Sequence, residues 1–169
     1  DAADLGRRVD AAFVMVMNWD QAKSAILGPD GLVETMEHGG VVILSATIKP
    51  HEAVEIGAAM QGSGIDLIDT PVSGGFSGAQ GGTLTMMVAA PDDVMARARP
   101  VLEAVSASIH HVGTKAGDGQ TVKACLQSLI GCQFSATFEA AALAAKAGVS
   151  GEVLYNVFST SGAGSGVVN

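Results

Sequence analysis

Three short apolar runs most constrain how this chain can fold. They are Ala11–Met17, Val41–Thr47 and Ile65–Val72, and a polar or glycine residue precedes each of them. Runs of this length predict buried strands, and segments with helical spacing lie between them. Strands that alternate with helices predict a parallel α/β sheet with helices on its faces. The 169 residues suffice for one domain, or for one domain and a piece of another.

The second half of the chain has a different pattern. A glycine-rich turn and an alternating apolar run precede a last predicted strand at Ser108–Gly113. From about Ala116 to Gly148 the sequence predicts a long, alanine-rich helix that is apolar on several sides, and a further helix follows. A helix with so broad an apolar surface is usually buried in a bundle or between domains. We therefore interpret the chain as an internal stretch of a longer enzyme; the alternative is a compact domain whose helices are completed by dimerisation.

Composition and charge exclude several classes of protein. Apolar residues make up 48% of the chain, which is too many for an intrinsically disordered protein. The formal net charge is -8 and no run of Lys or Arg occurs, so a global nucleic-acid surface is not expected. No segment has the length and hydrophobicity of a membrane span, and no signal peptide opens the chain. These features predict an acidic, soluble, cytoplasmic globular protein.

The cysteines and histidines do not predict a disulfide or a metal site. Cys125 and Cys132 are seven residues apart in a predicted helix, so their Cα atoms would be ~10 Å apart, too far for a disulfide. We expect both to be small apolar core residues. His110 and His111 are adjacent on a predicted strand and would point to opposite faces.

The segment Ser73-Gly74-Gly75 follows the third predicted strand. In open α/β sheets, ligands bind at the carboxyl ends of the strands. Glycines allow backbone N–H groups to approach an anion, and the Ser73 hydroxyl adds a further donor. The turn is therefore a candidate site for a small carboxylate; a tight glycine-rich turn without a ligand is the alternative.

Lys123 is the second candidate. A glycine-flanked turn, Gly117-Asp118-Gly119, opens the long predicted helix, and Lys123 and Gln127 then share one helix face. If partly buried, Lys123 would have a lowered pKa and could donate or accept a proton near neutral pH. Gln127 could hold a hydroxyl or carboxylate group beside it. The alternative is a lysine that extends its ammonium group into solvent.

These stretches resemble the β-hydroxyacid dehydrogenase family, which includes 3-hydroxyisobutyrate and threonate-type dehydrogenases. Asp69–Gly75 resembles its substrate-binding signature, Gly117–Lys123 its catalytic signature, and Ala46–Pro50 its Ser-Thr-Ile-x-Pro segment. The resemblance implies an oxidoreductase that transfers a hydride between NAD or NADP and a small 3-hydroxy acid. It further implies that Lys123 is the general acid/base.

The resemblance also assigns the remaining site residues. The substrate carboxylate would lie on the serine-glycine turn, an amide after the lysine would orient the substrate oxygen, and a threonine and two backbone positions would lie beside the cofactor. The implied substrate-binding residues are Ser73, Gly74, Gly75 and Gln127, and the implied cofactor-binding residues are Val16, Met17 and Thr47.

The resemblance implies a Rossmann-type domain that is incomplete. Residues 1–115 would be the second part of the dinucleotide-binding domain, and residues 116–169 an interdomain helix with the beginning of an all-helical domain. No G-x-G-x-x-G turn follows a strand, so we expect a chain truncated at both ends and inactive or nearly so. Ala46 replaces the usual serine. After the lysine the family commonly has Asn-Asn, or His-Gln in its threonate-type members, so Gln127 fits the threonate type and Leu126 fits neither pattern.

Two other functions remain open on the sequence. The chain could be a non-catalytic module that binds a small carboxylate, or a dimerisation domain. Under the enzymatic interpretation its partners would be a small hydroxy acid and further copies of itself, without nucleic acid or membrane.

Overall fold

The computed structural model describes residues 1–168, which form two compact units that divide between Ala124 and Cys125. The strands are β1 (Ala11–Val14), β2 (Val41–Leu44), β3 (Asp66–Asp69), β4 (Val72–Ser73), β5 (Leu84–Ala89) and β6 (Ser106–Gly113). The helices are α1 (Ala2–Gly6), α2 (Trp19–Leu27), α3 (Leu32–Thr35), α4 (Pro50–Ala59), α5 (Gly75–Gly81), α6 (Asp92–Glu103), α7 (Asp118–Lys146) and α8 (Gly151–Thr160).

The six strands form one sheet in the order β1-β2-β3-β5-β4, with β6 beside β5. The first three strands are parallel, and their last residues, Val14, Leu44 and Asp69, lie side by side. The predicted α/β sheet followed by a long helix is confirmed. The sheet is mixed rather than wholly parallel, because β5 pairs antiparallel with β3 and β4. Residues 74–83, which include the seven-residue helix α5, connect β4 to β5, and a connection this short favours antiparallel pairing over a crossover.

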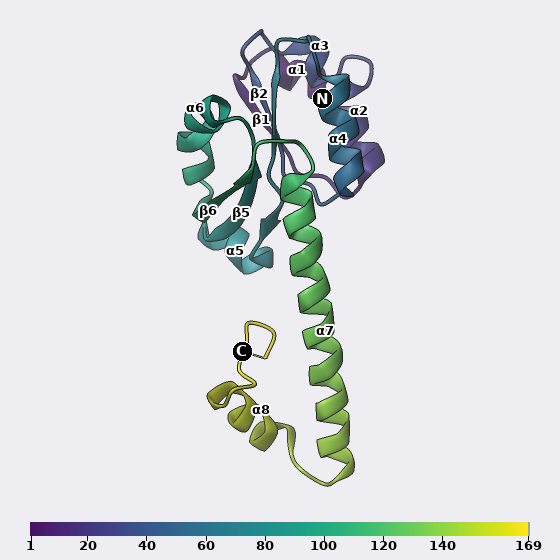
Figure 1. Cartoon of the computed structure of the whole chain (residues 1–169), viewed down its shortest axis with the longest axis vertical. Helices are drawn as coiled ribbons and strands as arrows, with labels where there is room; N and C mark the ends of the chain where they lie inside the picture. The colour runs from purple at the N-terminus through teal and green to yellow at the C-terminus, as the bar shows by residue number, and fades with distance from the viewer. Residues whose placement is uncertain (169) are drawn as a thin grey trace. The chain divides into compact units, whose positions relative to one another are not determined.

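Helices cover both faces of the sheet (Figure 1). Helices α2 and α4 bury Ile26 and Ile56 against one face, and α6 buries Leu102 against the other. All four residues of β2 are buried, which is typical of a strand covered on both sides.

Local signals explain where the helices begin. Asn18 Oδ1 accepts a hydrogen bond from the Gln21 backbone N–H at 3.0 Å and caps α2. Pro50 occupies the first turn of α4, and two aspartates occupy the first turn of α6. Helices α1, α3 and α5 are absent from the sequence-based prediction. Each has seven residues or fewer, which is too short for a helical period to stand out.

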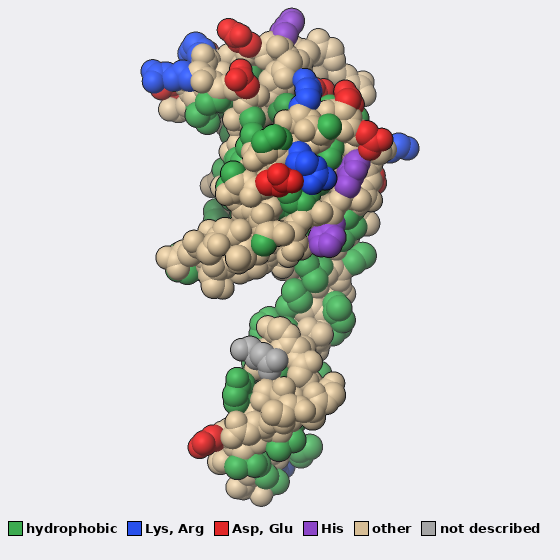
Figure 2. Space-filling model, turned by 90° about the vertical axis from the view of Figure 1, so that its left-hand side faces the viewer, with side chains coloured by type: hydrophobic (Ala, Val, Ile, Leu, Met, Phe, Trp, Pro, Cys, Tyr) green, Lys and Arg blue, Asp and Glu red, His purple; other side chains and the backbone are tan. Residues whose placement is uncertain are grey.

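The second unit contains most of α7 and all of α8. The Ser150 hydroxyl caps α8 by accepting from the Val153 N–H at 3.3 Å. Many large apolar side chains are exposed in this unit, and Figure 2 shows few charged groups over it. Cys125 and Cys132 are free, as expected, but both are exposed, so their assignment to the core is wrong. Burial depends on what lies opposite a helix face, and both cysteines belong to the unit in which many apolar side chains are exposed.

No helix within residues 1–168 is both long enough and apolar enough to cross a membrane.

The packing predicts a large cost for truncating β2. Leu44 is 0% exposed, so Leu44→Ala should lower the free energy of unfolding by about 2–5 kcal/mol in urea denaturation. As a control, Leu5→Ala removes the same atoms from a side chain that is 45% exposed. It should change stability by less than about 0.5 kcal/mol. Equal losses in the two variants would contradict the assignment of Leu44 to the core.

Candidate active site

The candidate site lies at the edge of the sheet where β1, β2 and β3 end. Because Val14, Leu44 and Asp69 are in register, the residues that follow β1 and β2 leave the sheet at the same edge. Val16 and Met17 follow β1, and Thr47 follows β2. In open α/β sheets this edge is where ligands bind. The structure therefore brings the three predicted cofactor residues to the appropriate edge; their role stays a prediction.

The Asp69 carboxylate binds the start of α7 at this edge through hydrogen bonds. Asp69 is fully buried, and its Oδ2 accepts hydrogen bonds from the backbone N–H groups of Gly117 at 2.9 Å and Gln120 at 3.2 Å. Gly117 directly precedes α7 and Gln120 lies in its first turn, where backbone N–H groups have no partner within the helix. Burial raises the pKa of Asp69, and the hydrogen bonds from Gln120 and Gly117 oppose that rise in part.

Gln120 completes the connection through its side-chain amide. Its Nε2 donates to Asp69 Oδ1 at 2.9 Å and to the Ala46 carbonyl oxygen at 3.0 Å, and its Oε1 accepts from the Ile48 N–H at 3.1 Å. Sequence reasoning did not single out Asp69 or Gln120 for this task. The available signal was position, because Asp69 opens one recognised signature and Gln120 lies three residues before Lys123 in the other.

Lys123 is buried one turn further along α7. Its exposed fraction is 7%, so the alternative of a lysine that extends into solvent is wrong. Within residues 1–168 it forms no ion pair. Burial lowers the pKa of Lys123, and no neighbouring carboxylate offsets this effect. A buried ammonium group without an ion-pair partner would be stabilised by a polar or anionic ligand.

A close backbone contact places the Lys123 face of α7 on the segment that leads to the serine-glycine turn. A Cβ on Gly119 would lie 2.6 Å from the Met87 carbonyl oxygen, 2.8 Å from that of Asp69 and 3.0 Å from Pro71 Cδ. Lys123 follows Gly119 by four residues, so both lie on one face of the helix.

The serine-glycine turn has the backbone conformation that its composition predicts. Gly74 and Gly75 have φ angles of 133° and 59°, which L side chains rarely adopt. Ser73 is half-buried on β4 and pairs with Thr85 of β5. Its hydroxyl forms no hydrogen bond among the described residues, so it is free to donate to a ligand. Gln127 is exposed on α7, in the second unit.

The other predicted cofactor positions differ in what they offer. Thr47 is exposed between Ala46 and Ile48, the two residues whose backbone groups bind Gln120. Met17 is 86% exposed, but its N–H donates to Gln21 Oε1 at 2.9 Å. Of its backbone groups, only the carbonyl remains available to a ligand.

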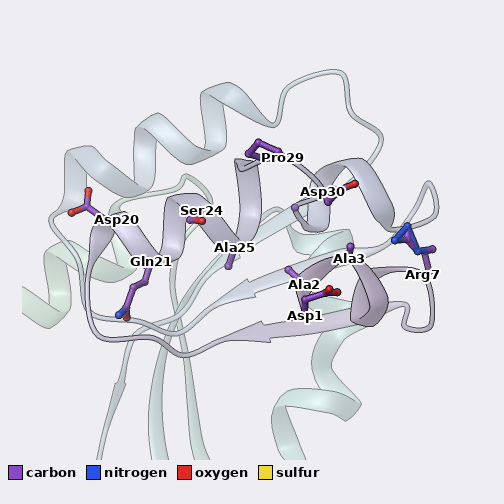
Figure 3. Close-up of a pocket in the computed structure, with 11 residues that line it drawn as sticks. Asp1, Ala2, Ala3, Arg7, Asp20, Gln21, Ser24, Ala25, Pro29 and Asp30 are labelled. Atoms are coloured by element: carbon purple, nitrogen blue, oxygen red, sulfur yellow. The ribbon is translucent and has the colours of Figure 1, made fainter.

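An open cavity of about 710 Å³ lies elsewhere in the first unit, between α1, α2 and the turn before α3 (Figure 3). Asp20, Gln21 and Ser24 of α2 line one side, and Asp30 and Arg7 lie toward the other end. None of the predicted site residues lines this cavity. No group of three His, Cys, Asp or Glu side chains within residues 1–168 could hold a metal ion.

Comparison with known proteins identifies the family. Residues 1–113 match the family model of the NAD binding domain of 6-phosphogluconate dehydrogenase. Residues 117–169 match the model described as NAD-binding of NADP-dependent 3-hydroxyisobutyrate dehydrogenase. The chain belongs to the β-hydroxyacid dehydrogenase family.

Relatives in this family are longer than the chain. L-Threonate dehydrogenase of Escherichia coli O6:H1 is 39% identical over 157 residues, which are 93% of this chain and 52% of that protein. A crystal structure of 3-hydroxyisobutyrate dehydrogenase from Salmonella typhimurium superimposes with a TM-score of 0.90 at 34% identity, over 99% of this chain and 58% of the other. The structure titled Psf3 in complex with NADP+ and 2-OPP gives 0.92 at 27% identity, over 99% and 59%. The chain thus spans about half the length of its relatives.

The close approach at Gly119 predicts that no side chain fits there. Gly119→Ala should destabilise the first unit by about 1–3 kcal/mol in chemical denaturation, because two carbonyl oxygens would have to move. Gly131→Ala is the matched control on the same helix, since nothing lies within 4 Å of its Cβ position. The control should stabilise by about 0.5–1 kcal/mol. A neutral Gly119→Ala would show that the helix start is loosely held.

The buried ammonium group predicts a pH dependence of stability. The pKa of Lys123 is lower in the folded chain than its ordinary 10.5, so between the two values the unfolded chain binds more protons. The free energy of unfolding is therefore not reduced by Lys123 above pH 10.5, where the amine is neutral in both states. It falls as the pH drops from 10.5 through the lowered pKa, because the buried group must then carry a charge. In urea unfolding, the advantage of Lys123→Met should be largest at neutral pH and shrink as the pH rises. Lys115→Met, at an exposed position, is the control for removing a lysine as such. A Lys123→Met effect that stays constant with pH would contradict burial of the charge.

Proposed function

We propose that the chain forms part of an NAD(P)-dependent dehydrogenase of small 3-hydroxy acids, with Lys123 as the general acid/base. The observation that carries the proposal is the burial of the Lys123 ammonium group, without a carboxylate partner, beside the ligand-binding edge of the sheet. Family membership supports the reaction class.

In the proposed reaction, Lys123 Nζ accepts the proton of the substrate hydroxyl during oxidation and returns it during reduction. A lowered pKa favours this, because more of the amine is then neutral and able to accept a proton near neutral pH. Ser73, Gly74 and Gly75 hold the substrate carboxylate with the serine hydroxyl and backbone N–H groups. Gln127 orients the substrate oxygen. The nicotinamide supplies the hydride chemistry.

The residues at the strand ends fit the nicotinamide end of a dinucleotide. Thr47 and Met17 are exposed at the same edge of the sheet, and the residues on either side of Thr47 bind Gln120 in the first turn of α7. The pyrophosphate end has no glycine fingerprint in this sequence. We therefore propose that residues 1–169 alone turn over little or no substrate. We assign residues 1–115 to the dinucleotide-binding domain and residues 116–169 to an interdomain helix and the beginning of a helical domain, in a cytoplasmic homo-oligomer.

Gln127 favours a polyhydroxylated acid of the threonate type as substrate. An amide can donate to one hydroxyl and accept from another, whereas Leu126 beside it can do neither. The 39% identity to a protein named L-threonate dehydrogenase supports the same choice.

A chimera tests the role of Lys123. In it, the chain replaces the matching half of the E. coli L-threonate dehydrogenase, and turnover of L-threonate is followed by NADH or NADPH absorbance. Loss of general acid–base help predicts that Lys123→Ala lowers kcat by about 10²–10⁴-fold while cofactor binding changes little.

Lys115→Ala, at an exposed position, serves as the matched control and should keep full turnover. Turnover of Lys123→Ala within a few-fold of the unmodified chimera would remove Lys123 from the mechanism. Hydroxy-acid binding without any nicotinamide binding would favour a non-catalytic binding module.

A further inference from the structure

The Asp69–Gln120 pair links the two segments on which the proposed site depends. Gln120 binds the backbone on both sides of Thr47, through the Ala46 carbonyl oxygen and the Ile48 N–H. The same residue lies in the first turn of α7, three residues before Lys123. Asp69 holds the Gln120 side chain with one carboxylate oxygen and the helix backbone with the other.

We propose that Asp69 and Gln120 are positioning residues. They hold the segment around Thr47 at a fixed distance from the turn of α7 that carries Lys123. Neither residue is assigned a contact with the reacting atoms. This inference rests on the proposed function, because it assumes that Thr47 and Lys123 serve the cofactor and the substrate. In physical terms, the Gln120 amide and the Asp69 carboxylate set the distance between the proposed cofactor-binding loop and the proposed general acid/base.

Helix capping alone does not require this arrangement. Asp69 Oδ2 already satisfies two N–H groups at the start of α7, and a cap needs nothing more. The Gln120 side chain adds three hydrogen bonds, of which two reach the loop after β2. Each of its polar side-chain atoms thus has a partner outside its own helix. Such a connection restrains the loop relative to the helix, whereas a cap restrains only the helix.

Stability alone does not require it either. Asp69 and Gln120 are 0% and 1% exposed, and burying a carboxylate is costly even when it is hydrogen-bonded. Apolar residues of similar size would fill the same volume without that cost. What they could not do is hold the Ala46 and Ile48 backbone groups in one direction.

The test uses Gln120→Leu and Asp69→Asn, with Thr121→Val as the matched control. Thr121→Val removes the hydroxyl that donates to the Gly117 carbonyl oxygen at 2.7 Å, in the same turn but outside the pair. In this chain, NMR hydrogen exchange reports on the Ile48 N–H, and lysine Cε signals report on Lys123. The exposed lysines Lys23, Lys49, Lys115 and Lys146 provide internal references.

Gln120→Leu should speed exchange of the Ile48 N–H about tenfold, as expected for one lost hydrogen bond. It should also raise the pKa of Lys123, because the turn of α7 that buries its ammonium group is then held less closely. Thr121→Val should do neither. In the chimera, both pair variants should lower kcat at least about tenfold and leave KM within a few-fold, because a misplaced group loses effective molarity rather than affinity.

The outcomes separate the two proposals. If Lys123→Ala keeps turnover while Gln120→Leu still shifts Lys123 and frees the Ile48 N–H, the proposed mechanism fails and the positioning link stands as a structural fact without a catalytic role. If Lys123→Ala is inactive while both pair variants keep kcat, the positioning proposal is overturned. Should Gln120→Leu fail to fold, the nearly isosteric Asp69→Asn carries the test. An unprotected Ile48 N–H in the unmodified chain would overturn the proposal outright.

Discussion

The buried carboxylate of Asp69 is the interaction on which the candidate site depends. Asp69 ends a central strand. Its carboxylate accepts two backbone hydrogen bonds at the start of α7, from Gly117 and Gln120, and one from the Gln120 side-chain amide. Burial without these donors would neutralise the carboxylate or expel it. With them, the start of a 29-residue helix is fixed to the end of the sheet. The position of Lys123 follows, because it lies one turn beyond that attachment.

Close packing at glycine makes this attachment possible. The Asp69 carboxylate can reach α7 only if the helix backbone approaches the strand ends, and Gly119 permits that approach between the carbonyl oxygens of Met87 and Asp69. Burial of Lys123 is a consequence of the same approach. Packing at the start of α7 therefore offsets the free-energy cost of desolvating the Lys123 ammonium group. The same close approach at Gly119 thus determines both the packing of α7 and the burial of Lys123.

Much of the fold was predictable because its signals are local. The buried runs at β1, β2 and β3 and the broad apolar surface of α7 depend on residues close in sequence, and all appear in the structure. The alternating apolar run predicted a strand at β5, but its antiparallel direction was not predictable, since strand direction depends on how a short connection packs. The exposure of Cys125 was missed for a related reason: burial depends on what lies opposite a helix face, which the sequence of that helix does not record.

The sequence by itself determined the order of the main strands and of the longer helices, the glycine turns and the candidacy of Ser73 and Lys123, because these depend on residue type and spacing. Only the tertiary structure decided that Lys123 is buried rather than solvated. It alone also decided that Asp69 and Gln120 join the ends of β2 and β3 to α7. Their partners are 48 to 74 residues away along the chain, and hydrogen bonds across such distances exist only after the sheet has formed.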